Sequence, residues 1–526
     1  MKSWRSLDRS KWVAVVLLGV IALAADVWLA VVTSRWGVAL SPDSLGYFRT
    51  ALKFAGAESS GPLSSGNLQA PFYPLVLAGL VKFGFDPPGA ARLLNLLLFP
   101  ANVALVGFIL TRLTCSAVAA ALGATLTATA QVVLGVHAHA WTEPLFMFFG
   151  LLGLYQLGAY AVRGAEWRYW VGLVSLTLAC LTRYAGIALL LAGALGLWLW
   201  APSGRRFLRC AGLLVLGVAP AVLWGLPRGP SSGDALFAGR GLVWHPITRE
   251  QLSRAFELVE LVLPERFASP ATFALVLALA CALLVGLLFG RPARLRDAIG
   301  DDRRRILGFY ALFLAIYPLF LATSISVYDA SLDLGPRLLR FVIYPSGLIV
   351  AVSVAWRLLS GRGRIVTVTA AAAFCLLVAM HVRRTVAWSK QYLAVGEGYS
   401  GKAWRESAAI RRVRELGNAA GYYSNDPGAI WFLAGGTAYP IPRKANPMSR
   451  RVNESFEAES ARLLERMEAE GALLVYLRGT QRWYLPSEQE LAGQLGLELI
   501  EDLGDGAFYR APTRRVGEPR AEVSRP

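Results

Sequence analysis

The sequence contains one carboxylate that is well suited to general-base chemistry. Asp43 follows an apolar run over residues 12 to 33 and begins a segment that continues through Tyr47. A carboxylate held at a membrane surface beside apolar protein tends to have a raised pKa, which suits a general base working near neutral pH. The alternative is that Asp43 or Ser44 only caps the helix that follows.

A second polar group lies between two later apolar runs, residues 116 to 136 and 142 to 162. It contains His137, His139 and Glu143. Together with Asp43, these residue types can bind a divalent cation, but the sequence supplies no further definite ligand. Histidines in a short interfacial turn, with Glu143 at a helix start, explain the same residues. The sequence therefore requires no cofactor, and a divalent cation stays an open alternative.

Arginine provides the candidate anion-binding groups. Arg183 stands between two apolar runs, and an arginine left in a bilayer core costs about 2.5 to 3.5 kcal/mol, so its side chain must face a polar cavity or an anion. A lipid phosphate is the obvious anion, because guanidinium binds phosphate oxygens in a bidentate way. An internal ion pair with Glu143 or Asp43 is the alternative. Arg337 either has the same role or anchors its helix at the interface.

The elements that position these residues are apolar segments. Of 526 residues, 55% are hydrophobic and 17% are charged, whereas soluble domains carry about 25% charged residues. This composition excludes an ordinary soluble enzyme. Runs long enough to cross a bilayer predict a polytopic α-helical membrane protein of about 11 transmembrane helices, at residues 12–33, 93–111, 116–136, 142–162, 167–182, 185–201, 208–226, 270–289, 306–325, 341–358 and 365–382.

The net charge of +18 would suggest nucleic acid in a soluble protein, but here it must be tested against the positive-inside rule. With the N-terminus in the cytoplasm, the basic residues of the short loops collect on the cytoplasmic side, so no nucleic-acid partner is expected. Treating residues 167 to 200 as one span would move two arginine clusters outside. We therefore predict a hairpin of two short helices, with Arg183 and Tyr184 at its apex.

The composition also predicts the domain organisation. Residues 1–384 form the transmembrane module with a first outer loop at 33–92, residues 385–512 form an extracytoplasmic α/β domain, and residues 513–526 form a disordered tail. Asn425 follows a predicted strand in the outer domain, and the carboxyl ends of strands commonly form ligand crevices. Turn chemistry explains Asn425 equally well.

In order and shared sidedness these residues resemble the GT-C superfamily of integral membrane glycosyltransferases, near the protein O-mannosyltransferase and aminoarabinose transferase branch. The matching residues are Asp43 with Tyr47, Pro71 to Pro74, Arg92 with Asn95, Thr142 to Pro144, Thr182 to Tyr184, and Arg337. The resemblance implies transfer of a sugar from a polyprenyl-phosphate donor to a glycan, lipid or protein acceptor on the extracytoplasmic face, with inversion. It also implies a multi-pass protein of a bacterial-type inner (plasma) membrane, in contact with membrane lipid.

The resemblance further implies roles for individual residues. Asp43 activates the acceptor hydroxyl and Glu143 assists, while the donor phosphate is bound by Arg92, Arg183 and Arg337. Substrate-binding positions are Tyr47, His139, Tyr184 and Asn425. Many family members have two adjacent acidic residues in the first loop, whereas Ser44 follows Asp43 here.

A transporter or flippase of a lipid-linked sugar is the alternative from another functional class. It would use the same contacts to an anionic lipid but would need no base. It predicts polar residues at mid-membrane depth on several helices, and the runs from residue 208 to residue 382 contain few such residues.

Overall fold

The computed structural model describes residues 9–57, 69–225, 244–256, 269–289, 299–332, 336–359, 363–417 and 421–512, with side chains from residue 12 except at 203 and 336–342. The chain divides into two compact units, one that ends at Ser400 and one that begins at Gly401. The predicted boundary after residue 384 falls within a helix that continues to Val395. The predicted tail, 513–526, lies outside the described residues.

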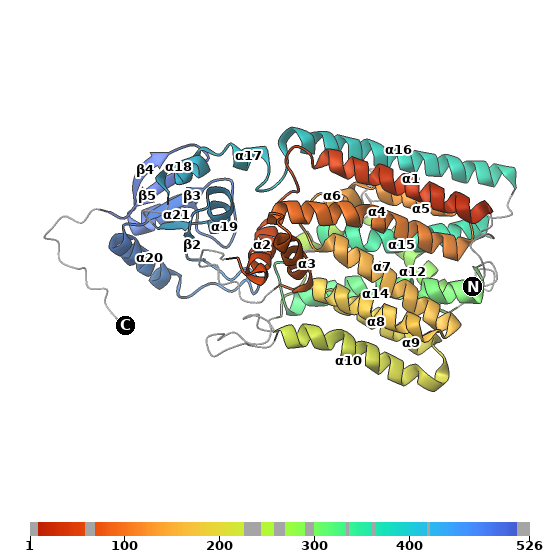
Figure 1. Cartoon of the computed structure of the whole chain (residues 1–526). Coiled ribbons are helices and arrows are strands. Elements are labelled where there is room, and N and C mark those ends of the chain that lie inside the picture. Colours follow the sequence, from red (N-terminus) through yellow and green to blue (C-terminus); the bar gives the residue numbers. More distant parts are fainter. Residues whose placement is uncertain are drawn as a thin grey trace. The chain divides into compact units, whose positions relative to one another are not determined.

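The first unit is a bundle of helices around an apolar core (Figure 1). The helices that coincide with the predicted spans are α1 (Arg9–Val32), α4 (Pro87–Thr114), α5 (Ala117–Thr129), α6 (Gln131–His137), α7 (Glu143–Arg163), α8 (Glu166–Thr182), α9 (Gly186–Trp200), α10 (Arg206–Gly225), α12 (Pro270–Phe289), α14 (Asp301–Val327), α15 (Pro336–Leu359) and α16 (Arg364–Val395). Three further helices are α2 (Pro42–Ala55), α3 (Phe72–Lys82) and α11 (Arg249–Phe256).

Among the described residues, seven helices are long and apolar enough to cross a membrane, or eight if α5 and α6, bent by 60°, form one span. The chain is thus an integral membrane protein. The other predicted spans coincide with α8 and α9, which are shorter than a full crossing by this measure, and with α15, whose side chains are described only from Ile343 onward. Every predicted span is helical, but the count of eleven is not confirmed.

The predicted hairpin over residues 167 to 200 is confirmed. The chain forms two helices, α8 and α9, which contact each other and are joined at Arg183 (Figure 1). The amide of Arg183 still donates to the carbonyl of Ala179, and the amide of Gly186 donates to the carbonyl of Arg183. These bonds make a tight turn, which fixes the position of the arginine between the helices.

Residues 38–40 are held on both sides by backbone pairing. Ala39 pairs with His139 and Leu40 pairs with Gly398. The amide of Ala39 donates to the Ala138 carbonyl over 2.8 Å, and the amide of Tyr399 donates to the Leu40 carbonyl over 2.9 Å. This short three-segment arrangement connects the residues after α1, the turn before α7 and the residues after α16. It therefore fixes the point from which α2 starts.

Helix α2 begins with a capping box. Ser41 is the N-cap and accepts from the amide of Ser44, whose hydroxyl accepts from the amide of Ser41 in return. Pro42 stands at the first helical position, where it is well tolerated. The described cap thus uses Ser41 and Ser44, while Asp43 lies in the first turn, where the helix dipole favours a carboxylate.

The second unit is a five-stranded sheet with helices (Figure 1). The strand order is β2-β1-β3-β5-β4, with β1 parallel to β2 and β3, and β5 antiparallel to β3 and β4. The strands are β1 (Tyr422–Ser424), β2 (Ala438–Pro440), β3 (Leu473–Leu477), β4 (Glu498–Asp502) and β5 (Gly506–Arg510), and the main helices are α18 (Ala408–Leu416), α20 (Phe456–Glu470) and α21 (Glu488–Leu495).

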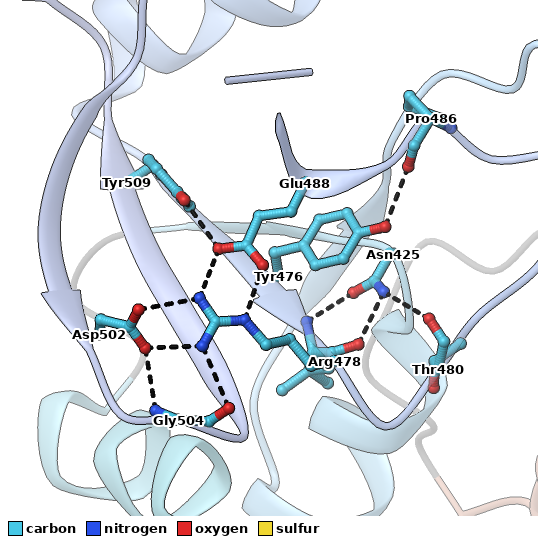
Figure 2. Close-up of polar contacts among 10 residues, drawn as sticks. Asn425, Tyr476, Arg478, Thr480, Pro486, Glu488, Asp502, Gly504 and Tyr509 are labelled. Carbon is cyan, nitrogen blue, oxygen red and sulfur yellow. Dashed lines mark hydrogen bonds and ion pairs between the residues drawn. The ribbon is translucent and has the colours of Figure 1, made fainter. Parts of the chain in front are cut away.

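One arginine connects three elements of this unit. Arg478, just after β3, bonds the carboxylates of Glu488 on α21 (2.7 and 2.8 Å) and Asp502 on β4 (2.7 and 2.9 Å), as Figure 2 shows. The hydroxyl of Tyr509 donates to Glu488 over 2.8 Å. The hydrogen bond from Arg478 lowers the pKa of Asp502 to about 2. This network holds the second unit together independently of the first.

The pairing at residues 38–40 generates a stability prediction. Gly398 has φ +59°, and a Cβ there would overlap the Leu40 carbonyl oxygen. Gly164 has a similar φ of +67° with nothing within 4 Å of its Cβ position. Gly164→Ala should cost about 1 to 2 kcal/mol for the left-handed conformation, and Gly398→Ala should cost clearly more. Thermal unfolding of the two variants in detergent tests this, and equal losses would contradict the role of the pairing.

Candidate active site

The site is built at the end of the bundle where α1 ends and α4, α7 and α9 begin. Asn95, about two turns into α4, donates from Nδ2 to the carbonyls of His137 (2.8 Å) and His139 (2.7 Å). Asn102, about two turns further, donates to the carbonyl of Pro144 over 3.0 Å. The two amides therefore fix the turn that carries Glu143.

His137 is part of this scaffold. Its Nδ1 lies 2.7 Å from the Val133 carbonyl, which can only accept, so Nδ1 carries the hydrogen. Its Nε2 lies 3.1 Å from the Asn102 amide nitrogen and accepts from it. His137 is fully buried and has both ring nitrogens engaged. Within the described part of the chain, no group of three or more His, Cys, Asp or Glu side chains could hold a metal ion.

Glu143 and Arg183 form an ion pair. Arg183 Nη1 lies 2.8 Å from Glu143 Oε1 and 2.8 Å from the Thr142 hydroxyl, and that hydroxyl donates to Glu143 Oε2 over 3.2 Å. The Glu143 side chain is 0% exposed and the Arg183 side chain is 16% exposed. This is the internal pair that the sequence left as an alternative for Arg183. Both Glu143 oxygens are occupied, so Glu143 orients Arg183, whose guanidinium remains partly accessible.

His139 is also held by two partners. Its Nε2 lies 3.1 Å from Glu397 Oε2, and its Nδ1 lies 2.8 Å from the Gly135 carbonyl. Both ring nitrogens are therefore engaged with oxygen atoms of the chain. The ring stacks on Trp141 at 3.9 Å, and the Trp141 indole donates to the Ser41 hydroxyl over 2.9 Å. His139 thereby links the residues after α16 to the cap of the helix that carries Asp43.

Asp43 lies close to this turn because of packing between α2 and α3. The half-buried Asp43 accepts at its backbone carbonyl from Gln69 Nε2 over 3.5 Å. Tyr47, one turn along α2, packs edge-to-face on Tyr73 of α3, with ring centroids 5.2 Å apart. Burial, the Tyr47 ring and the Glu143 charge raise the pKa of Tyr73. The structure therefore brings Asp43, Tyr47 and the Glu143–Arg183 pair into one region.

The remaining predicted site residues have other surroundings. Arg92 donates to the Thr33 hydroxyl (3.1 Å) and the Ala30 carbonyl (3.2 Å) and so binds the end of α1. Tyr184 packs partly buried against the core of the bundle. Arg337 lies on α15, but its side chain is outside the described residues.

Asn425 belongs to the second unit and joins the ends of two strands. It is 2% exposed. Its Nδ2 donates to the carbonyls of Leu477 (2.9 Å) and Thr480 (3.0 Å), and its Oδ1 accepts from the Leu477 amide over 2.8 Å (Figure 2). These bonds agree with the structural alternative for Asn425, in which it serves the turn.

Four residues near the site were not predicted to take part in it: Gln69, Tyr73, Asn102 and Glu397. Asn102 had a signal, because it is an amide inside the apolar run over residues 93–111. Tyr73 lies within the segment Pro71 to Pro74 that matches the family, and Gln69 lies just before it, but neither was given a role. Glu397 had no signal, because its partner His139 is far away in the sequence.

Comparisons with known proteins identify a family segment and a shared fold. Residues 68–227, which include Tyr73, Glu143 and Arg183, match the family model for dolichyl-phosphate-mannose-protein mannosyltransferase. The chain is similar to ArnT from Cupriavidus metallidurans bound to undecaprenyl phosphate, with TM-score 0.55 and 13% identity over 96% of this chain and 100% of that chain.

It is also similar to the archaeal oligosaccharyltransferase AglB from Archaeoglobus fulgidus in complex with an inhibitory peptide and a dolichol-phosphate, with TM-score 0.50 and 14% identity over 90% of this chain and 70% of that chain. No curated protein matches the sequence significantly. The predicted resemblance to the GT-C membrane glycosyltransferases is confirmed by the family match over residues 68–227 and by the fold that the chain shares with these structures.

The Glu397 contact generates a pH prediction. Burial alone would raise the pKa of Glu397, but bonds from His139 and Trp388 outweigh it and hold the pKa below its ordinary value of 4.5. A group with a lowered pKa stabilises the fold above its ordinary pKa and loses that contribution as the pH falls through the folded-state pKa.

Wild type should therefore unfold at a higher temperature than Glu397→Gln at about pH 7, and the difference should shrink below about pH 4.5. Glu250→Gln, which removes an exposed glutamate paired with Arg254 on the next turn, is the control. A difference between wild type and Glu397→Gln that stays constant down to about pH 3 would contradict an ionised Glu397.

Proposed function

We propose that this protein transfers a sugar from a polyprenyl-phosphate donor to an acceptor hydroxyl, with inversion, on the extracytoplasmic face of a bacterial-type inner membrane. The observation that carries the proposal is a half-buried carboxylate, Asp43, in the same region as an arginine, Arg183, that a buried glutamate orients. Support also comes from the mannosyltransferase segment and from the fold shared with a protein bound to undecaprenyl phosphate. The flippase alternative is not favoured, since these relatives are transferases.

The proposed reaction is a single displacement at the sugar anomeric carbon. Asp43 takes the proton of the acceptor hydroxyl, and the acceptor oxygen forms a bond to the anomeric carbon. The bond from that carbon to the phosphate oxygen breaks, and polyprenyl phosphate leaves with the electron pair. Base and cation on opposite sides of the reacting carbon stabilise the charge that develops on each oxygen.

Glu143 has a positioning role in this proposal. A guanidinium paired with one buried carboxylate keeps a fixed orientation, and the Arg183 side chain is still 16% exposed, which leaves it accessible to a phosphate. Arg337 and Arg92 are further phosphate-binding candidates, although Arg92 also binds the end of α1. Tyr47 and Tyr184 are proposed substrate contacts.

Topology completes the proposal. If α8, α9 and α15 also cross the bilayer, the protein has eleven spans, with the N-terminus in the cytoplasm and the sheet-containing unit after Gly401 outside. The basic residues at the opposite ends of the helices, among them Arg112, Arg163 and Arg303, then lie in the cytoplasm as the positive-inside rule requires.

Asp43→Asn tests the proposed base. It keeps the shape of the side chain but cannot accept the proton, so transfer from undecaprenyl-phosphate sugars should fall at least about 100-fold with an unchanged thermal midpoint. Asp86→Asn is the matched control, because Asp86 is an exposed carboxylate at the start of α4 with no side-chain cap bond. Full turnover by Asp43→Asn in reconstituted vesicles would rule out the mechanism.

A second test separates the phosphate role of Arg183 from its structural role. Arg183→Gln removes the arginine that pairs with the buried Glu143 carboxylate, and breaking a buried ion pair on one side typically costs about 3 to 5 kcal/mol. The double variant Arg183→Gln/Glu143→Gln removes both charges and should recover most of the thermal midpoint, yet bind undecaprenyl phosphate at least about tenfold more weakly than wild type. Wild-type affinity of a stable double variant would exclude Arg183 from the phosphate site.

A further inference from the structure

Two buried polar atoms beside Asp43 have no hydrogen-bond partner among the described residues. They are Oε1 of Gln69 and the hydroxyl of Tyr73. Tyr73 is 0% exposed. Leaving such a group unsatisfied in a protein interior costs about 1 to 3 kcal/mol, so a pair of them at one place needs an explanation.

The surroundings of Gln69 keep its amide next to the first turn of α2. Its Nε2 points to the Asp43 carbonyl, its own carbonyl accepts from the Trp224 indole over 3.2 Å, and Gly46 leaves the room that the amide occupies. A Cβ on Gly46 would overlap this amide. With Nε2 directed at the Asp43 carbonyl, the free atom is the amide oxygen, which can only accept a hydrogen bond.

Tyr73 is held by its ring while its hydroxyl stays unbonded. The ring packs edge-to-face on Tyr47, at 5.2 Å between centroids. The hydroxyl lies within electrostatic range of Glu143, the partner of Arg183. Tyr73 thus contacts the helix that carries the proposed base and lies within electrostatic range of the glutamate that pairs with Arg183.

The chemistry of the two atoms selects the ligand. An amide oxygen repels a phosphate and attracts a hydroxyl, while a phenol can donate to or accept from a hydroxyl. We infer that Gln69 and Tyr73 form a subsite that binds hydroxyl groups of the transferred sugar, separate from the arginines that bind its phosphate. This inference rests on the proposed function, because it assigns a part of the donor to the same site.

The energetics distinguish this subsite from a structural role. Removing an unsatisfied buried polar atom costs the empty protein nothing and can stabilise it, whereas removing a satisfied one costs stability. Tyr310 is the matched comparison, because it is equally buried but donates to the Leu151 carbonyl over 2.8 Å. Tyr73→Phe and Tyr310→Phe remove the same atom from the two kinds of environment.

The experiment uses the full chain in nanodiscs. Tyr73→Phe should keep or raise the thermal midpoint, while Tyr310→Phe lowers it. Gln69→Leu also removes the long bond to the Asp43 carbonyl and should lower the midpoint less than Tyr310→Phe does. Both site variants should bind undecaprenyl phosphate, which carries no sugar, as wild type does. The sugar-bearing probes are the mannose, glucose and arabinose derivatives of undecaprenyl phosphate. The informative probes are those that wild type binds more tightly than undecaprenyl phosphate itself. Each site variant should bind these probes about tenfold more weakly than wild type does.

The outcomes separate the inference from the function on which it depends. Site variants that lose stability as Tyr310→Phe does, or that bind every sugar-bearing lipid as tightly as wild type, would overturn the subsite while leaving the transferase proposal in place. A wild type that binds none of the sugar-bearing lipids more tightly than undecaprenyl phosphate would overturn the subsite as well. A wild type that binds no polyprenyl phosphate at all would overturn the proposed function, and the subsite with it.

Discussion

The backbone pairing of residues 38–40 is the constraint on which the site depends. Backbone amides and carbonyls buried away from water must find partners, and here a segment that follows α1 finds them on two sides at once, in Ala138 and in Tyr399. Three parts of the chain that are far apart in sequence are thereby held at one place. The start of α2, the turn before α7 and the residues after α16 cannot move independently.

Side-chain contacts join the same three segments that the backbone pairing joins. Glu397, His139, Trp141 and Ser41 form a chain of contacts from the residues after α16 to the cap of α2. Tyr392 adds bonds from α16 to the carbonyls of Gly37 (2.9 Å) and Ala138 (3.2 Å). The consequence for chemistry is that Asp43 sits on a helix whose first turn is fixed, which a general base requires.

The Glu143–Arg183 pair adds a second physical requirement. A buried carboxylate is tolerated because a guanidinium and a hydroxyl satisfy both of its oxygens, and the guanidinium is held at a helix break that the sequence itself provides. Next to this satisfied pair, Gln69 and Tyr73 keep unsatisfied polar atoms. A preorganised binding site needs both kinds of group. Side chains whose hydrogen bonds are complete hold the site in place, and neighbouring polar atoms without a partner can bind the ligand.

The sequence by itself determined the membrane class, the helical segments, the break at Arg183 and the interest of Asp43, Glu143 and Arg183. These follow from hydropathy, from the cost of charge in a bilayer and from residue type, all of which are local properties. Local properties also located the strand before Asn425, which the structure shows as β1.

Only the tertiary structure decided which partner each polar group takes. The sequence allowed Arg183 a phosphate, Asp43 or Glu143, and the packing of α7 against α8 and α9 selected Glu143. It allowed His139 a metal or a substrate, and the return of α16 supplied Glu397. For Asn425 the sequence allowed either a ligand-binding role in a crevice or a structural role in a turn. In the folded chain, the Asn425 side chain bonds to residues at the end of β3 and just beyond it. Whether a group is satisfied depends on contacts between distant segments, and that is why Gln69 and Tyr73 became visible as open positions only in the folded chain.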